Sequence, residues 1–220
     1  MGNTTEIRTT AVVLAAGAGT RLGRGPKALL PFRGRPLVES IAGALLDGGC
    51  REVVVVLGSR APDVTAIAEL DRYKTVVNRD WQSGMGSSFL LGNATADPQD
   101  HLLIALVDQP GLTLRTVGRL LAAHRPGRIT AASYGRSGSD GGSDGGGDGG
   151  TDEGAIGTVR RGHPLLIDVG LRSAVAETVT GDAGARGFLQ SHPELVDEVD
   201  CSDQSTGEDI DTPEQLRLLG

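Results

Sequence analysis

A glycine-rich stretch early in the chain contains two cations whose spacing suits a phosphorylated ligand. It follows the apolar residues 12–16 and includes Arg21 and Lys27 among glycines at Gly17, Gly19, Gly23 and Gly25. Glycine lets the backbone adopt positive φ and turn successive N–H groups toward one anion, while the two side chains add positive charge. The sequence therefore predicts a phosphate-binding loop, with a tight turn that binds no ligand as the alternative.

Two common phosphate-binding motifs differ from this loop. A P-loop ends in Gly-Lys-Ser/Thr, whereas Lys27 stands between Pro26 and Ala28, so that motif is absent. The dinucleotide fingerprint G-x-G-x-x-G requires a glycine at the position of Leu22. This mismatch weakens a dinucleotide-binding interpretation and leaves it open.

Acidic residues follow in the second half of the chain. Asp108 comes directly after the apolar run 102–107, and Asp211 precedes the terminal helical segment. Ligands of open α/β sheets bind beyond the carboxyl ends of strands, so Asp108 is well placed to hold a cation. A helix cap or a turn at Pro110 is the alternative for Asp108, and support of the helix dipole is the alternative for Asp211. Two carboxylates near a triphosphate suit Mg²⁺, and the set favours phosphoryl or nucleotidyl transfer. We expect neither a Ser/His/Asp triad nor a metal-binding histidine cluster.

Two further polar segments precede or interrupt helical patterns. The turn 78–88 contains Asn78, Ser83 and Gly84 before a helix, where free N–H groups can meet a phosphate or base, or where an ordinary helix cap forms. A second glycine-spaced segment, 181–189, carries both an acid and an arginine and is predicted to be a loop.

Strand and helix patterns alternate along the chain. The β-branched run 52–58 is typical of a strand buried on both faces, and Leu37, Ile41 and Leu45 give a helical period that stops at Gly48. Further strands are predicted at 7–16, 75–78, 101–107, 128–134, 165–167 and 194–199, and further helices at 62–70, 87–96, 113–124, 171–178 and 214–219. This order predicts an α/β fold of three layers, a Rossmann-like, mostly parallel sheet with helices on both faces.

Composition limits the classes of protein. A chain of 220 residues with 38% hydrophobic and 3% aromatic residues suits a single domain, 1–220, with an aliphatic core. The tract 137–154, rich in Gly and Asp, is expected to be a disordered insertion. A net charge of −7 disfavours nucleic acid and an anionic membrane as partners. Without a signal peptide or a long apolar run, the expected compartment is the cytoplasm.

Six motifs in order resemble the MobA/MocA-like nucleotidyltransferases, a family that includes the molybdenum-cofactor cytidylyltransferases. The resemblance covers nearly the whole chain and implies a fold of the nucleotide-diphospho-sugar transferase type. The motifs are Leu14-Ala15-Ala16-Gly17 with Arg21, Gly23, Lys27 and Leu30-Pro31; residues 78–84 with Ser88; Asp108-Gln109-Pro110; Gly162-His163-Pro164; residues 181–186; and residues 209–214.

The resemblance implies an Mg²⁺-dependent enzyme whose first loop holds a nucleoside triphosphate. Arg21 and Lys27 would neutralise its phosphates, and Asp108 with Asp211 would hold the metal ion. The implied nucleotide-binding residues are Leu14, Ala15, Ala16, Gly17, Gly19, Asn78, Ser83 and Gly84. The implied residues on the acceptor side are His163, Asp182, Gly184 and Arg186.

In the implied reaction, the phosphate of an acceptor attacks the α-phosphorus in line and expels pyrophosphate. Ala16, in place of a second glycine, favours the cytidylyl branch, so that CMP is transferred from CTP rather than GMP from GTP. The implied acceptor is molybdopterin or a similar phosphorylated molecule, and the apoprotein of a molybdenum hydroxylase is a further partner.

Two other functions stay open at this point. Relatives that share these motifs include nicotine-dye reductases, which makes an NAD(P)H-dependent oxidoreductase the first alternative, although the interrupted dinucleotide fingerprint counts against it. The second is a non-catalytic factor that binds nucleotide or molybdopterin during the maturation of a molybdenum hydroxylase. Release of pyrophosphate distinguishes the transferase from both.

Overall fold

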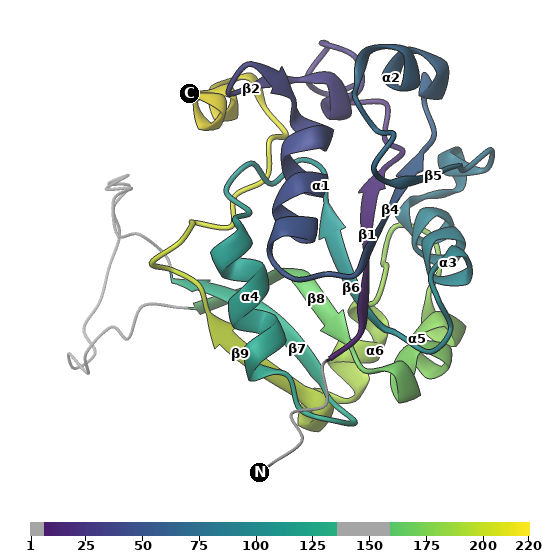
Figure 1. Cartoon of the computed structure of the whole chain (residues 1–220), viewed down its shortest axis with the longest axis vertical. Coiled ribbons are helices and arrows are strands. Elements are labelled where there is room, and N and C mark those ends of the chain that lie inside the picture. Colours follow the sequence, from purple (N-terminus) through teal and green to yellow (C-terminus); the bar gives the residue numbers. More distant parts are fainter. Residues whose placement is uncertain (1–6, 136–158) are drawn as a thin grey trace, which may run out of the picture.

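A computed structural model describes residues 7–135 and 159–220 of this chain. The tract 137–154 lies outside the described residues, so its disorder stays a prediction. The described residues form a seven-stranded sheet with the order β5-β4-β1-β6-β8-β7-β9 and a separate two-stranded ribbon, β2-β3 (Figure 1).

The main sheet is mostly parallel, as predicted. In the described parts of the chain six of its strands share one direction, and β8 alone runs antiparallel to its neighbours β6 and β7. The strands are β1 (Thr9–Ala15), β4 (Glu52–Leu57), β5 (Lys74–Val77), β6 (His101–Leu106), β7 (Ile129–Gly135), β8 (Val159–Ile167) and β9 (Val196–Asp200), and the ribbon is β2 (Pro31–Phe32) with β3 (Arg35–Pro36).

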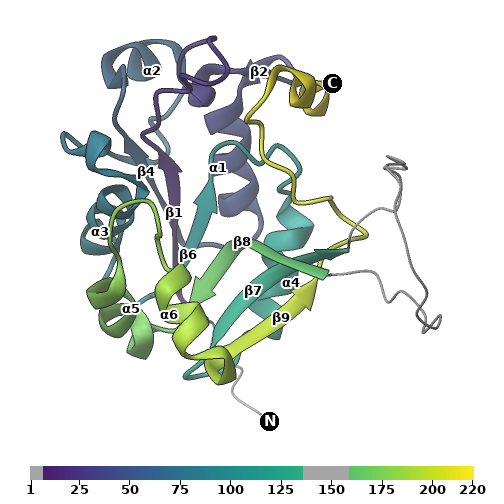
Figure 2. The same ribbon diagram turned by 180° about the vertical axis from the view of Figure 1, so that it is seen from behind.

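Helices cover both faces of this sheet (Figures 1 and 2). One face carries α1 (Leu37–Asp47), α2 (Ala61–Ile67) and α4 (Leu114–Ala123), and the other carries α3 (Met85–Thr95), α5 (Arg172–Thr178) and α6 (Arg186–Ser191). Alternate residues of β1 enter the two cores: Val13 joins the α1 side, whereas Val12 joins the side of Phe89 in α3. The predicted three-layer α/β architecture is therefore confirmed.

Two local predictions were wrong, those for 181–189 and for the start of β8. The segment 181–189, predicted as a loop, turns into α6 at Arg186, because Phe188 and Leu189 are both buried in the core beneath it. The predicted terminal helix is present as a 3₁₀ helix, Pro213–Leu219. Strand β8 begins at Val159, well before the predicted start, and pairs with β7 over this added length. Four shorter 3₁₀ turns occur at Lys27–Leu29, Trp81–Ser83, Val169–Leu171 and Pro193–Leu195.

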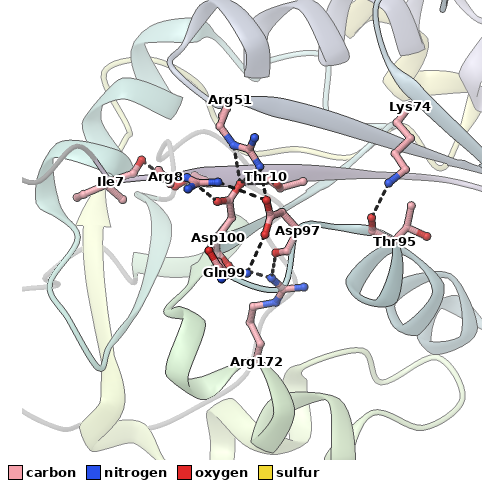
Figure 3. Close-up of polar contacts among 11 residues, drawn as sticks. Ile7, Arg8, Thr10, Arg51, Lys74, Thr95, Asp97, Gln99, Asp100 and Arg172 are labelled. Atoms are coloured by element: carbon pink, nitrogen blue, oxygen red, sulfur yellow. Dashed lines mark hydrogen bonds and ion pairs between the residues drawn. The ribbon is translucent and has the colours of Figure 1, made fainter.

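An ion-pair cluster closes the amino edge of the parallel strands (Figure 3). The fully buried carboxylate of Asp100 accepts hydrogen bonds from Arg51 at 2.9 and 2.8 Å and from Thr10 at 2.8 Å. Below it, the buried guanidinium of Arg172 donates to the carbonyls of Asn93, Asp97 and Asp100 at the end of α3. These contacts pair both buried groups and join the starts of β1 and β6 to α5. The second Asp100 oxygen, Oδ1, has no hydrogen bond and lies 3.2 Å from Arg8 Nε.

A membrane-spanning helix is absent from residues 7–135 and 159–220, where no helix has the length and apolarity to cross a bilayer.

Candidate functional site

The glycine-rich loop lies at the carboxyl edge of the sheet and folds back on itself. Gly19 has φ 63°, and a Cβ there would lie 2.2 Å from the carbonyl oxygen of Gly25, so only glycine fits. Gly23 and Gly25 also have positive φ, as predicted, whereas Gly17 does not. The backbone of Gly19 thus packs against that of Gly25, shortly before Lys27 in the chain.

Lys27 and two acids form a compact ionic cluster at the same edge. The Lys27 Nζ atom lies 2.8 Å from Asp108 Oδ2 and 2.5 Å from Asp211 Oδ1. The Ile210 N–H donates to the Asp108 carbonyl at 2.9 Å, which fixes the C-terminal segment beside the end of β6. Burial lowers the pKa of Lys27, but the charges and hydrogen bonds of Asp108 and Asp211 outweigh it and raise this pKa overall.

The two carboxylates of this cluster fit a hard divalent cation. Both already face a single positive charge, the ammonium of Lys27, and carboxylate oxygens are the ligands that Mg²⁺ prefers. Beside them, the Gln109 side-chain amide donates to Asp209 Oδ1 at 2.6 Å. Burial and the nearby charge of Asp108 raise the pKa of Asp209. Neither Gln109 nor Asp209 was among the predicted site residues, although both belong to motifs that were recognised.

Other residues of the first loop are placed differently. Arg21 is exposed, and within the residues that the structure describes it has no ion pair with the Lys27 cluster. Ala15 and Ala16 are buried, with Ala15 in the core, so any ligand contact from them would come from the backbone. Leu14 lines a cavity described below.

The turn 78–88 is held by internal hydrogen bonds. Asn78 is buried and donates to Ser87 and Ser88 at 2.8 and 2.9 Å, and its Oδ1 accepts from the Asp80 N–H at 2.9 Å. Ser83 donates to the Asp80 carbonyl. The side chain of Asn78 thus organises this turn from within.

The first N–H groups of α3 are also occupied. Met85 N–H donates to Asp182 Oδ1 at 3.0 Å, and Gly86 N–H donates to the Gly181 carbonyl at 2.7 Å. Gly84, with φ 115°, allows this close approach, because a Cβ there would lie 2.6 Å from the Gly181 carbonyl carbon. These two N–H groups, which were expected to be available to a ligand phosphate, instead donate to Asp182 and Gly181.

A cavity of about 380 Å³ opens between α3 and α6, over residues of β1, β6 and β8. Its floor is apolar and comes from β1, α3 and β6, while three arginines and His163 provide its polar side. It brings together four predicted site residues, Leu14, His163, Gly184 and Arg186, and continues past Gln109 and Asp209 toward the Lys27 cluster. The lining also includes Met85, Phe89, Ile104, Leu106, Arg160 and Arg161.

His163 is neutral in this cavity. Burial, followed by the positive charges of Arg160 and Arg186, lowers its pKa to about 4. A neutral imidazole among arginines can accept a hydrogen bond from a ligand or stack on a ring without adding charge.

We expect the melting temperature of His163→Gln to fall less than that of the original chain as the pH is lowered through the mildly acidic range. The unfolded chain binds a proton on this imidazole below about pH 6.5, whereas the folded chain resists it until about pH 4. This contribution to stability is therefore present above pH 6.5 and lost as the pH falls toward 4. Melting temperatures of both proteins across this range measure it, and parallel curves would contradict the assignment.

One cluster at the opposite edge of the sheet was missed by sequence reasoning. Contrary to expectation, two histidines do converge with an acid: His101, His124 and Asp168 each place one ligand atom within 4.8 Å of the others. These three residues are far apart in the sequence, so no motif with a characteristic spacing predicted that they would meet. They lie far along the strands from Lys27, so they belong to a different site.

Comparisons with known proteins agree on the fold and differ on the activity. The profile of the MobA-like NTP transferase domain matches residues 11–196. A protein named nicotine blue oxidoreductase from Paenarthrobacter nicotinovorans is 58% identical over 220 residues, which is 100% of both chains. A molybdenum cofactor guanylyltransferase from Xanthomonas euvesicatoria pv. vesicatoria is 39% identical over 113 residues, 51% of this chain and 53% of that one.

Among solved structures, a nucleotidyl transferase from Methanothermobacter thermautotroptrophicus superposes with a TM-score of 0.76 over 99% of this chain and 97% of that chain. At 24% identity this likeness shows the fold alone. The fold is that of the nucleotide-diphospho-sugar transferases.

Proposed function

This chain belongs to the MobA-like NTP transferase family, and from that premise we propose that it transfers a nucleotidyl group from a nucleoside triphosphate to a phosphorylated acceptor. The observation that carries the proposal is the Lys27 ammonium held between Asp108 and Asp211, directly after a glycine-rich loop. A cation and two acids at the carboxyl edge of a parallel sheet suit a polyphosphate and its metal ion.

Each part of this cluster has a role in the proposal. Backbone N–H groups of the glycine-rich loop and the Lys27 Nζ atom bind the phosphates, with exposed Arg21 available to the same ligand. Asp108 and Asp211 would hold Mg²⁺, which, when bound, neutralises phosphate charge. Lys27, which pairs with both acids in this structure, would pair with a nucleotide phosphate if these carboxylates held the metal ion.

The reaction balances without a further co-reactant. An oxygen of the acceptor phosphate forms a bond to the α-phosphorus, the bond from that phosphorus to the α–β bridging oxygen breaks, and pyrophosphate leaves with the electron pair. Positioning and electrostatic stabilisation supply most of the catalysis in such transfers.

The cavity beside the cluster favours an acceptor with a flat ring and an anionic group. Its apolar floor suits the ring, and Arg160, Arg161 and Arg186 suit a phosphate. A molybdopterin-like acceptor has both features, and a molybdenum hydroxylase would then receive the product. Ala16 supports CTP as the donor, although one relative is a guanylyltransferase, so both nucleotides belong in the test.

A second candidate, an NAD(P)H-dependent oxidoreductase, is favoured by one specific observation. The relative named nicotine blue oxidoreductase matches this chain at 58% identity from end to end, far beyond the partial match to the guanylyltransferase. The same cavity, with its apolar floor and neutral His163, also suits an aromatic dye.

One paired assay separates the candidates. Purified protein with Mg²⁺ and molybdopterin is given CTP, GTP or ATP, and pyrophosphate is measured; in parallel, NADPH consumption is followed with a nicotine-blue-type dye. We expect pyrophosphate with CTP ahead of GTP, and its loss in Lys27→Met.

NADPH consumption that persists in Lys27→Met, without pyrophosphate from any nucleotide, would replace the first proposal with the second. Stoichiometric nucleotide binding without either turnover would instead indicate the non-catalytic maturation factor.

A further inference from the structure

The cluster of His101, His124 and Asp168 lies at the amino edge of the parallel strands, away from the Lys27 site. His101 opens β6, Asp168 follows the end of antiparallel β8, and His124 follows the end of α4. Because β8 pairs antiparallel with β6, its last residue, Ile167, lies beside Leu102. The fold thus brings three potential metal ligands from three elements to one point.

The spacing of these ligands suits a small tetrahedral ion. Asp168 Oδ2 lies 3.4 Å from His101 Nδ1 and 3.6 Å from His124 Nε2. A tetrahedral ion with bonds of about 2.1 Å separates its ligands by about 3.4 Å. The His101 and His124 rings lie edge to face, with their centroids 4.8 Å apart.

Two backbone N–H groups of the turn after β8 donate to the side chains of this cluster. The Val169 N–H donates to His101 Nδ1 at 3.0 Å, so this nitrogen carries no proton. Asp168 Oδ1 accepts from the Gly170 N–H, which leaves Oδ2 directed at the imidazoles. A metal ion bound at His101 Nδ1 would take the place of the hydrogen bond from Val169, because this nitrogen has a single lone pair.

His124 provides the independent sign of a ligand. Its side chain is 1% exposed, its Nδ1 pairs with the Thr130 hydroxyl at 2.9 Å, and its Nε2 atom is buried without a hydrogen-bond partner. A buried polar atom left unpaired costs about 1–3 kcal/mol, and a metal ion at Nε2 removes that cost.

We propose that His101, His124 and Asp168 form a binding site for a transition-metal dication of the zinc class. Two imidazoles and one carboxylate favour such an ion over Mg²⁺ or Ca²⁺, which prefer all-oxygen ligands. His101, whose side chain is 18% exposed, marks the solvent side, where water completes the fourth position. The ion ties the start of β6 to the ends of β8 and α4.

The neighbouring ion-pair cluster supports this site from one side. Arg51 and Thr10 fix the Asp100 carboxylate (Figure 3). Asp100 directly precedes His101 in the chain. On the other side, the Thr130 hydroxyl pairs with His124 Nδ1 and fixes the orientation of the ring, as hydrogen-bond partners of metal-binding histidines do.

Zinc binding to the full chain tests the proposal. Chelator-treated, untagged protein is titrated with ZnCl₂ in millimolar MgCl₂, which occupies a hard-oxygen site at Asp108 and Asp211, and bound zinc is measured against a chromogenic chelator. We expect one equivalent bound, and affinity weakened at least about tenfold in His124→Gln and Asp168→Asn. At about 100 times the Kd, the melting temperature should rise by about 5–10 °C.

Two further variants keep the result interpretable. His101→Asn changes the partly exposed ligand and so tests the site even if the buried variants do not fold. His192→Gln removes an imidazole stacked on Phe188, outside the cluster, and should bind zinc like the original chain. Absence of zinc binding in the original chain, or equal affinity in all variants, would overturn the proposal.

Discussion

Asp108→Asn is expected to slow pyrophosphate release by on the order of 10³-fold while the protein stays folded. The substitution keeps the shape of the side chain and removes the negative charge that faces Lys27 and, in the proposed reaction, the metal ion. Lys27 keeps its contact with Asp211 Oδ1, so the melting temperature should change little. Initial rates at saturating nucleotide and Mg²⁺, with a thermal melt of each sample, measure both effects.

Asp203→Asn is the matched control for this experiment. Asp203 is an exposed acid paired with Arg119, and the same chemical change there should leave turnover within about twofold. If Asp108→Asn retained full activity, Asp108 would have no part in the reaction. A parallel loss of activity in both variants would point to a general effect of charge.

Asp100→Asn is expected to lower the melting temperature by about 6–20 °C. The Asp100 carboxylate is fully buried and accepts from Arg51 and Thr10, so removing its charge disrupts a buried network at a cost of about 3–5 kcal/mol. For a domain of this size each kcal/mol corresponds to about 2–4 °C. A thermal melt followed by circular dichroism measures the shift.

Asp97→Asn provides the comparison, because Asp97 pairs with the same Arg51 from a partly exposed position. Exposed ion pairs contribute little to stability, so the melting temperature of Asp97→Asn should fall much less than that of Asp100→Asn. Equal shifts for the two variants would show that burial of the Asp100 carboxylate is not what stabilises this edge.

Much of the fold could be predicted from periodicity. The β-branched run 52–57 can only be buried on both faces, and helices between such strands impose parallel pairing. The helix α6 was missed because Gly184 and Gly187 flank its start, and only burial of Phe188 and Leu189 stabilises so short a helix. Tertiary packing, which sequence patterns do not display, decided that segment.

The two ionic sites differ in how far sequence could predict them. Asp108 follows an apolar strand and Lys27 follows a glycine-rich loop. The neighbouring sequence therefore indicated that each residue lies at the carboxyl edge of the sheet. His101, His124 and Asp168 carry none, because their meeting depends on β8 entering the sheet antiparallel beside β6. Similarly, the cap that Asp182 supplies to α3 joins two loops far apart in sequence.

The backbone hydrogen bond from Ile210 to Asp108 has a consequence for how the Lys27 cluster is assembled. As the ribosome releases the chain, Lys27 and Asp108 emerge long before Asp211, and amino-terminal segments begin to fold first. The early pair can therefore form while the second acid is still being synthesised. In the proposed reaction, a nascent chain that stops short of residue 211 would lack the second acid and would not transfer a nucleotidyl group.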